Sequence, residues 1–201
     1  PCLLHRPQHL NSEKMKGKIM TIKEKADKLL HETGLCQELK KYGEPHPIGS
    51  YRMDMMVYND LDIDIQNDSM TLEKLHSLTL YILTTFRPTW YEAREEINDE
   101  GKTVWFHGFH ALFMDELWNF DLWFFDRETI TKAEAYCDNI TMLCRQTPSL
   151  KTAITTIKKD LLSQGLYRYD KYTSMDVYQS VLTEGITNTQ AFLKKHPLPT
   201  L

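Results

Sequence analysis

The segment from position 60 to 65 reads Asp-Leu-Asp-Ile-Asp-Ile, and it constrains the fold more than any other stretch of this chain. Successive side chains of a β-strand point to opposite faces, so strict alternation of acidic and apolar residues predicts a strand with two unlike faces. Leu61, Ile63 and Ile65 would then face a core, while three aspartates share the other face. Like charges at this spacing repel one another, so the acidic face is either solvated or holds cations.

Length and composition indicate a globular protein. The chain has 201 residues, of which 41% are hydrophobic and 26% charged, so it can form one sizeable domain, alone or with a small appendage. A run of about 18 apolar residues is absent from the sequence, so we expect no transmembrane helix. The four cysteines form no C-x-x-C pair and no secretory signal is visible, which makes a reducing, cytoplasmic location the default expectation.

Charge is distributed unevenly along the chain. The net charge is -4, but residues 1–20 and residues 127–201 each carry +3, whereas residues 21–126 carry -10. An acidic chain is a poor generic ligand for a polyanion, so stable nucleic-acid binding is not expected. The opposite signs of the middle and the tail favour docking of one against the other. The sequence is compatible with an oligomer as well as with a monomer.

The first half of the chain begins with a helix. Thr21 and Glu24 form a predicted capping box, and the helix should end near Gly34. A second short helix is expected over 36–41. The two prolines at 45 and 47 exclude a regular central strand there, and residues 51–57 are compatible with a helix.

The later elements follow from turn and cap signals. A helix is predicted over 70–86, and strands over 89–97, 102–113 and 117–125 form an antiparallel meander. From position 128 onward every signal is helical, with helices expected near 129–145, 149–164, 174–184 and 188–195, the last opening with a capping box at Thr187 and Gln190. We therefore divide the chain into a flexible leader (1–20), a catalytic domain (21–126) and a helical C-terminal region (127–201).

A glycine-serine pair lies ten residues upstream of the acidic strand. Gly49 and Ser50 form a small-residue turn that enters a helix, and such a turn offers backbone N–H groups and a hydroxyl to phosphate oxygens. Carboxylates on a neighbouring strand suit Mg²⁺, which prefers oxygen ligands. Together these features predict a site for a nucleoside triphosphate and its metal.

The spacing of these residues resembles a known superfamily. Gly49-Ser50-Tyr51-Arg52 and Asp60-Leu61-Asp62-Ile63, with nine residues between Ser50 and Asp60, are similar to the signature of the nucleotidyltransferase superfamily that includes DNA polymerase β. The local pattern looks most like the small lincosamide and aminoglycoside nucleotidyltransferases. The family's third carboxylate comes from a later apolar strand, where Asp121 fits. The core of the resemblance covers about residues 45–126.

This resemblance implies a fold, a site and a reaction. The fold is α/β (α+β), with a mixed, mostly antiparallel sheet flanked by helices and a helical C-terminal region. The implied metal ligands and catalytic residues are Asp60, Asp62 and Asp121, and two Mg²⁺ ions would bridge the triphosphate. Asp64 replaces Asp60 if the register shifts, because Asp62-Ile63-Asp64-Ile65 also satisfies the pattern.

The phosphates would be bound by Gly49, Ser50 and Arg52. A nucleoside monophosphate would pass to a hydroxyl or amine of a small acceptor, such as an antibiotic, with loss of pyrophosphate. Transfer of AMP to a protein, as in toxin–antitoxin modules, and a non-catalytic binding module are the alternatives.

Several other residues could have either a functional or a purely structural role. His107 and His110 fall on opposite faces of a strand, so a joint metal site is not expected. The aromatic residues Trp90, Tyr91, Trp105, Trp118 and Trp123 are mostly core by expectation, with a stacking surface as the alternative. Cys137 and Cys144 lie two helical turns apart and are expected to be buried packing residues. The basic residues of the tail either form a solvated face or reach over the nucleotide phosphates; they are Lys158, Lys159, Arg168 and Lys171.

Overall fold

The computed structural model describes residues 19–67, 69–98 and 100–198. The leader expected over 1–20 therefore lies almost wholly outside the described residues. The described part forms eight helices and five strands, in this order: α1 (Ile22–Glu32), α2 (Leu35–Leu39), β1 (Glu44–Pro47), α3 (Gly49–Arg52), β2 (Asp60–Gln66), α4 (Leu72–Thr85), β3 (Trp90–Ile97), β4 (Thr103–Phe113), β5 (Glu116–Phe125), α5 (Arg127–Gln146), α6 (Pro148–Ser163), α7 (Ser174–Leu182) and α8 (Thr189–Lys195).

The strands of the described residues form one mixed sheet in the order β1-β2-β5-β4-β3. The predicted meander of β3, β4 and β5 is confirmed, and β1 pairs antiparallel with β2 at one edge. The remaining pair, β2 and β5, is parallel and aligns Asp62 with Asp121. The expected α/β class, with a mostly antiparallel mixed sheet, flanking helices and a helical C-terminal region, is confirmed.

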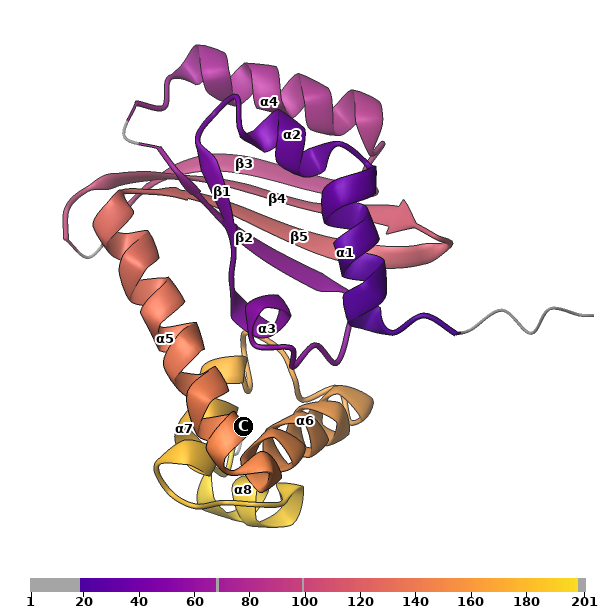
Figure 1. Cartoon of the computed structure of the whole chain (residues 1–201), viewed down its shortest axis with the longest axis vertical. Coiled ribbons are helices and arrows are strands. Elements are labelled where there is room, and N and C mark those ends of the chain that lie inside the picture. Colours follow the sequence, from indigo (N-terminus) through magenta and orange to yellow (C-terminus); the bar gives the residue numbers. More distant parts are fainter. Residues whose placement is uncertain (1–18, 68, 99, 199–201) are drawn as a thin grey trace, which may run out of the picture.

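One face of the sheet is covered by α1, α2 and α4 (Figure 1). Leu29 of α1 and Leu78 of α4 are fully buried with the apolar residues of β2 and β5. The rings of Phe109 and Phe120 stack across β4 and β5, with centroids 4.2 Å apart. Because each fully buried Leu, Ile or Phe side chain contributes about 1.5–3 kcal/mol, this core fixes which face of β2 carries the aspartates.

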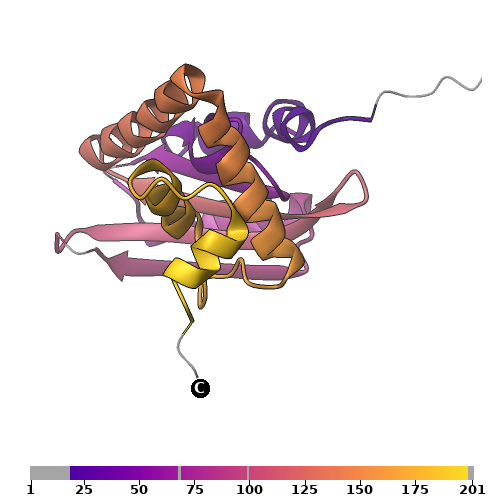
Figure 2. The same cartoon turned by 90° about the horizontal axis from the view of Figure 1, so that it is seen from below.

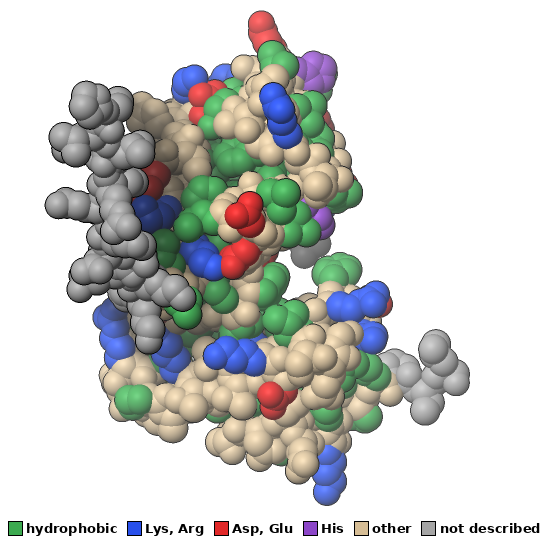
Figure 3. Space-filling model, turned by 90° about the vertical axis from the view of Figure 1, so that its right-hand side faces the viewer, with side chains coloured by type: hydrophobic (Ala, Val, Ile, Leu, Met, Phe, Trp, Pro, Cys, Tyr) green, Lys and Arg blue, Asp and Glu red, His purple; other side chains and the backbone are tan. Residues whose placement is uncertain are grey.

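The helical region lies below the opposite face of the sheet (Figures 1 and 2). Helix α5 leaves the end of β5, and α6, α7 and α8 pack with it around a second hydrophobic core that includes Ile157, Val177 and Phe192. Met53 and Met55, from the loop after α3, are buried in this second core. Figure 3 shows hydrophobic side chains reaching the surface near the notch between the sheet-bearing part and the helical region.

The loop after α3 corrects one expectation. Residues 51–57 were helix-compatible by sequence, yet α3 ends at Arg52. Asp54 adopts a positive φ of 54°, which breaks the helix and lets Met53 and Met55 turn into the second core. The proline-bearing segment forms β1, and it is an edge strand, as two prolines allow.

The helix starts agree with the sequence except at one point. The capping box at Thr21 is confirmed. The capping box expected at Thr187–Gln190 is wrong, because the Asn188 side chain caps α8 by accepting from the Ala191 N–H at 2.9 Å. The second capping box lies instead at Thr173, before α7. Among the described residues, no helix has the length and apolarity that crossing a membrane requires.

Candidate active site

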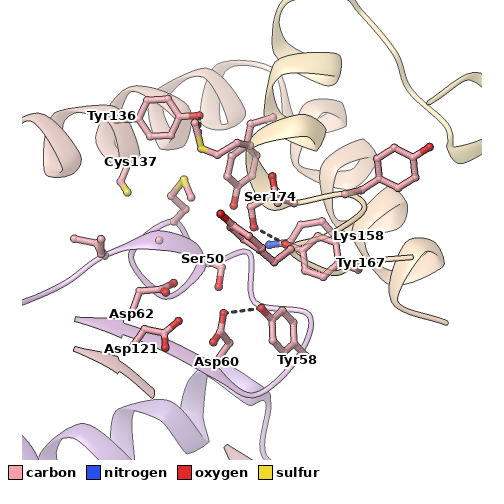
Figure 4. A pocket seen from close by; sticks show the side chains of 18 of the residues that line it. Ser50, Tyr58, Asp60, Asp62, Asp121, Tyr136, Cys137, Lys158, Tyr167 and Ser174 are labelled. Atoms are coloured by element: carbon pink, nitrogen blue, oxygen red, sulfur yellow. Dashed lines mark hydrogen bonds between the residues drawn. The ribbon is translucent and has the colours of Figure 1, made fainter. Parts of the chain in front are cut away.

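Three carboxylates meet where the parallel strands β2 and β5 lie side by side. Asp60 and Asp62 point to the same face of β2, and the register places Asp121 of β5 directly beside Asp62. One carboxylate oxygen from each lies within 4.8 Å of the others, and they form the group of His, Cys, Asp or Glu side chains that could hold a metal among the described residues. Figure 4 shows all three pointing into one cavity.

The electrostatics of this group favour a bound cation. Burial raises the pKa of Asp62 well above 3.8, and the neighbouring carboxylates add to the rise. Burial and the charge of Asp60 raise the pKa of Asp121 to about 6, against the opposing effect of the Asn119 hydrogen bond. Clustered carboxylates that resist ionisation are stabilised by a divalent cation, whose positive charge reverses the local effect.

Two neighbours hold Asp60 in place. The Tyr58 hydroxyl donates to its Oδ2 at 2.7 Å, and the Asn119 side chain donates to its Oδ1 at 2.7 Å. Asn119 also donates to Asp121 Oδ2 at 3.3 Å. These contacts link the two strands at the carboxylates and fix the orientation of the potential ligands.

The turn at Gly49 approaches the carboxylates closely. The Ile48 N–H donates to the Asp62 carbonyl at 3.0 Å, which holds the turn against β2. Gly49 has a φ of 59°, and a Cβ at this position would lie 2.5 Å from Asp62 Oδ2. Only glycine allows both the backbone angle and the approach. Ser50 follows it as a buried residue in the cavity wall.

The cavity has a volume of about 530 Å³ and lies between the sheet and the helical region. The carboxylates and the Gly49 turn form one wall, and residues of α5, α6, α7 and the loop before α7 form the other (Figure 4). The second wall is rich in tyrosine; it includes Tyr136, Tyr167, Tyr169, Tyr172 and Tyr178. A cavity of this size suits a nucleotide-sized ligand.

Lys158 is the buried cation of this cavity. Its side chain is 1% exposed, and Nζ donates to the Met55 carbonyl at 3.3 Å. Burial lowers its pKa to about 8, whereas Asp60 and Asp62 favour its charged form. The residue therefore sets a positive charge across the cavity from the carboxylates.

Comparison with known proteins gives matches among solved structures alone. No protein-family model and no curated protein matches the sequence. A structure of the Cid1 poly(U) polymerase bound to MgATP is similar, with a TM-score of 0.57 and 14% identity over 80% of this chain and 49% of that one. A cytoplasmic RNA terminal U-transferase has a TM-score of 0.53 and 14% identity over 80% of this chain and 47% of that one.

The non-canonical poly(A) polymerase complex of GLD-2 with GLD-3 has a TM-score of 0.50 and 14% identity, covering 91% of this chain and 62% of that one. This chain has the nucleotidyltransferase fold. It spans about half the length of the first of these structures. They are described as a poly(U) polymerase, an RNA terminal U-transferase and a poly(A) polymerase, so they do not show the resemblance to the small antibiotic-modifying subgroup.

Within this nucleotidyltransferase fold, Arg52 lies away from the cavity. Its guanidinium donates to both carboxylate oxygens of Asp138 at 2.8 and 2.9 Å and to Glu134 at 3.1 Å, on the outer side of α5. In the structure Arg52 thus links α3 to α5 and is not among the residues that line the cavity, and its contact with phosphate stays a prediction. Lys158, by contrast, lines the cavity.

The structure separates Asp64 from the acidic group. Asp64 is 2% exposed, and burial together with the charge of Glu134 raises its pKa to about 7. It does not line the cavity, whereas Asp60 and Asp62 do. The geometry favours the register that uses Asp60 and Asp62.

The two histidines form no joint metal site among the described residues, and the two cysteines of α5 pack in a hydrophobic core, as predicted. His107 is fully buried in the sheet core, where its Nδ1 is 2.9 Å from the Tyr91 hydroxyl, and burial lowers its pKa to about 4. His110 lies on the opposite face of β4, as the spacing of three predicted. Cys137 and Cys144 are buried on α5 in the second core.

Sequence reasoning missed most of the cavity's second wall. Tyr58, Tyr167 and Tyr178 were not considered, although four tyrosines between 167 and 178 are a compositional signal. The Tyr178 hydroxyl is buried without a hydrogen-bond partner among the described residues, and it faces the cavity. Lys158 was one of four basic candidates, and periodicity alone could not separate it from its exposed neighbour Lys159.

Proposed function

We propose that this chain is a metal-dependent nucleotidyltransferase, which moves a nucleoside monophosphate from a nucleoside triphosphate to an acceptor hydroxyl with release of pyrophosphate. The observation that carries the proposal is the group of three carboxylates on adjacent parallel strands, with one oxygen of each within 4.8 Å of the others, facing a cavity with a glycine turn and a buried lysine. The fold, which is similar to that of a poly(U) polymerase and a poly(A) polymerase, supports the proposal by analogy.

The residues fit the metal ions that this reaction needs. Carboxylate oxygens are the ligands that Mg²⁺ prefers. Burial and mutual repulsion raise the pKa values of Asp62 and Asp121, so a cation between them would relieve the repulsion of their charged forms. Asp60 and Asp62 would hold the ions at the triphosphate, and Asp121 would share the ion nearer the acceptor. Bound Mg²⁺, with two ions expected, would neutralise charge on the triphosphate and favour ionisation of the acceptor hydroxyl.

The other groups of the cavity bind and orient the nucleotide. Lys158 would donate to phosphate oxygens, and the Ser50 hydroxyl with the backbone N–H groups of the Gly49 turn would bind them from the other side. The tyrosine-rich wall would pack on the base and sugar and exclude water from the reacting atoms. Catalysis by this arrangement is mostly positioning and charge neutralisation.

The acceptor favoured by the comparisons is the 3′-hydroxyl of an RNA strand. Two of the similar structures are described as a poly(U) polymerase and an RNA terminal U-transferase. A small hydroxylated or aminated molecule is the second candidate, because the net charge of -4 disfavours tight binding of a polyanion. Both acceptors would use the same metal and nucleotide site.

The proposal is tested by calorimetric titration of the protein with a non-hydrolysable ATP or GTP analogue, with and without Mg²⁺. We expect Mg²⁺-dependent binding that is lost in Asp62→Asn, since this carboxylate belongs to either register. Asp115→Asn is the matched control, because this exposed aspartate lies at the β4–β5 turn with a positive φ that asparagine also adopts. Analogue binding of equal affinity with and without Mg²⁺, or binding that Asp62→Asn retains, would contradict the proposal. A folded protein that binds neither analogue would contradict it as well.

The acceptor is then identified with a labelled nucleoside triphosphate. The protein is incubated with a short single-stranded RNA or with a panel of aminosugars, and the labelled product is resolved by size. Label on the RNA that disappears when its 3′ end is deoxy supports the first candidate, and label on an aminosugar alone supports the second.

A further inference from the structure

An aromatic patch lies on the sheet face that carries the acidic group. Its members come from β3, β4 and β5: Trp90, Phe106, His110, Trp123 and Phe125. The ring centroids of Trp90 and His110 are 4.8 Å apart, and those of Phe106 and Trp123 are 4.5 Å apart. Trp123 and Phe125 are nearly parallel, at 7°. Figure 2 views the molecule from the side to which this face turns.

The patch begins beside the carboxylate that we place nearest the acceptor. Asp121 pairs across the sheet with Gly108, and Trp123 is the next residue of β5 on the same face. A Cβ on Gly108 would lie 2.7 Å from the Phe106 ring and 3.0 Å from the Trp90 ring. The absence of a side chain at Gly108 therefore lets the Phe106 and Trp90 rings come close to β4 beside Asp121.

The patch belongs to neither hydrophobic core. Trp123 contacts Phe106 and Phe125, while the opposite face of the same strands is packed under α1, α2 and α4. Trp90 is 41% exposed. The other rings are half-buried or buried, with Phe106 only 6% exposed, so Trp90 and its half-buried neighbour His110 are the part of the patch that a ligand can reach.

The charges on this face do not suit phosphate groups. The Arg94 guanidinium lies 4.2 Å from the centre of the Phe106 ring, and it is already paired with Glu92 at 2.7 Å and with Glu96. The charge of Arg94 is already neutralised by two carboxylates, so it would attract a phosphate group only weakly. Because the same guanidinium also lies over the Trp123 ring, at 5.7 Å, recognition on the patch would come from stacking on Trp90 and His110.

We propose that the aromatic patch seats the terminal base of a single-stranded acceptor, so that its 3′-hydroxyl is presented to Asp121. This inference rests on the proposed function, and it specifies how the acceptor is held. Stacking tolerates any base, because every base has a π-face. Since Arg94, the arginine over the patch, is already paired with two carboxylates, affinity for the acceptor should depend little on salt, unlike that of proteins that bind nucleic acid through phosphates.

The test uses a 5′-fluorescein-labelled octaadenylate with a 3′-deoxy end, and fluorescence anisotropy at several NaCl concentrations. Trp90→Ala should raise the Kd by about fivefold to a hundredfold, as expected for the loss of one stacking ring. Trp90→Phe keeps a ring and should retain most of the affinity. Ile97→Ala is the matched control, because this exposed apolar residue lies on the same strand but on the opposite face.

Binding of the Mg²⁺–nucleotide analogue is measured on the same samples to separate the two proposals. Unchanged analogue binding with weakened oligonucleotide binding in Trp90→Ala supports the patch. Two results overturn the inference and leave the proposed function intact. In one, the protein binds the analogue but not the oligonucleotide; in the other, Trp90→Ala binds the oligonucleotide as tightly as the wild type does. If Trp90→Ala folds poorly, His110→Ala reports on the same ring pair.

The salt dependence and the oligomeric state give independent outcomes. A slope of log affinity against log salt shallower than about -1.5 supports stacking, and a steeper slope indicates several phosphate contacts and overturns it. A change of oligomeric state in Trp90→Ala, measured by light scattering, without a change in oligonucleotide affinity would make the patch a contact between copies and would also overturn the inference.

Discussion

Replacing Asp121 with asparagine should stabilise the metal-free protein while it destroys the metal site. Asparagine keeps the shape of the side chain and an oxygen that can accept from Asn119. It removes a negative charge that the fold disfavours, because burial and Asp60 raise the pKa of this carboxyl from 3.8 to about 6. At about 1.4 kcal/mol per pKa unit, the ionised form costs the folded state up to about 3 kcal/mol.

The pH dependence of this effect has a definite sign. A carboxyl with a raised folded-state pKa destabilises the fold at pH values above about 6, and the penalty is relieved as the pH falls through 6 toward 3.8. Asp121→Asn should therefore be more stable than the wild type by about 3 kcal/mol at pH 7.5 and by only about 1 kcal/mol at pH 4.5. For a chain of this length, the first difference corresponds to a rise in Tm of roughly 6–12 °C.

The assay is urea unfolding in EDTA at the two pH values, repeated at pH 7.5 with Mg²⁺. Mg²⁺ should stabilise the wild type and have a much smaller effect on the variant, because only the former has the complete ligand set. Asp115→Asn, an exposed change of the same charge, controls for net charge. A destabilised Asp121→Asn at pH 7.5 without metal, or an effect of equal size at both pH values, would refute the reasoning.

Three further substitutions separate the roles of the cavity residues. Gly49→Ala should abolish Mg²⁺-dependent analogue binding and lower the unfolding free energy by about 1–3 kcal/mol, because the new Cβ meets Asp62 at a positive φ; calorimetry and urea unfolding check this. Lys158→Met should raise the Kd of the nucleotide analogue at least about tenfold with the fold retained, and an unchanged Kd would locate the phosphates elsewhere. Arg52→Met should cost about 0.5–1 kcal/mol of stability through its partly exposed ion pairs and leave analogue affinity unchanged. A tenfold weaker affinity would instead return Arg52 to the phosphates.

Much of the acidic site could be predicted because it depends on local periodicity. The alternation around Asp60 and Asp62 fixes their common face, and the apolar residues between them fix which face is buried. Asp121 was accessible to the same argument, since it alternates with buried Phe120 and Leu122 in β5. What brings the two strands together is a parallel pairing, which has no local signal in the sequence.

The positions of Arg52 and Lys158 could not be predicted, for a different reason. Arg52 is close to Gly49 in sequence, but the short helix α3 turns its side chain outward to Asp138 on α5. The direction of such a side chain depends on a helix that begins more than 70 positions later. Lys158 is the converse case, because its burial depends on how α6 packs beneath the loop that carries Met55.

The parallel pairing of β2 with β5 also orders events during synthesis. The helix α4 and the whole β3–β4 hairpin lie between the two strands in the chain, so the strand that carries Asp121 leaves the ribosome well after the one that carries Asp62. Until β5 has emerged, β2 has neither its parallel neighbour nor its third carboxylate, and its aspartates remain hydrated. A nascent chain would therefore complete the proposed metal site late, when a contact of long sequence separation closes.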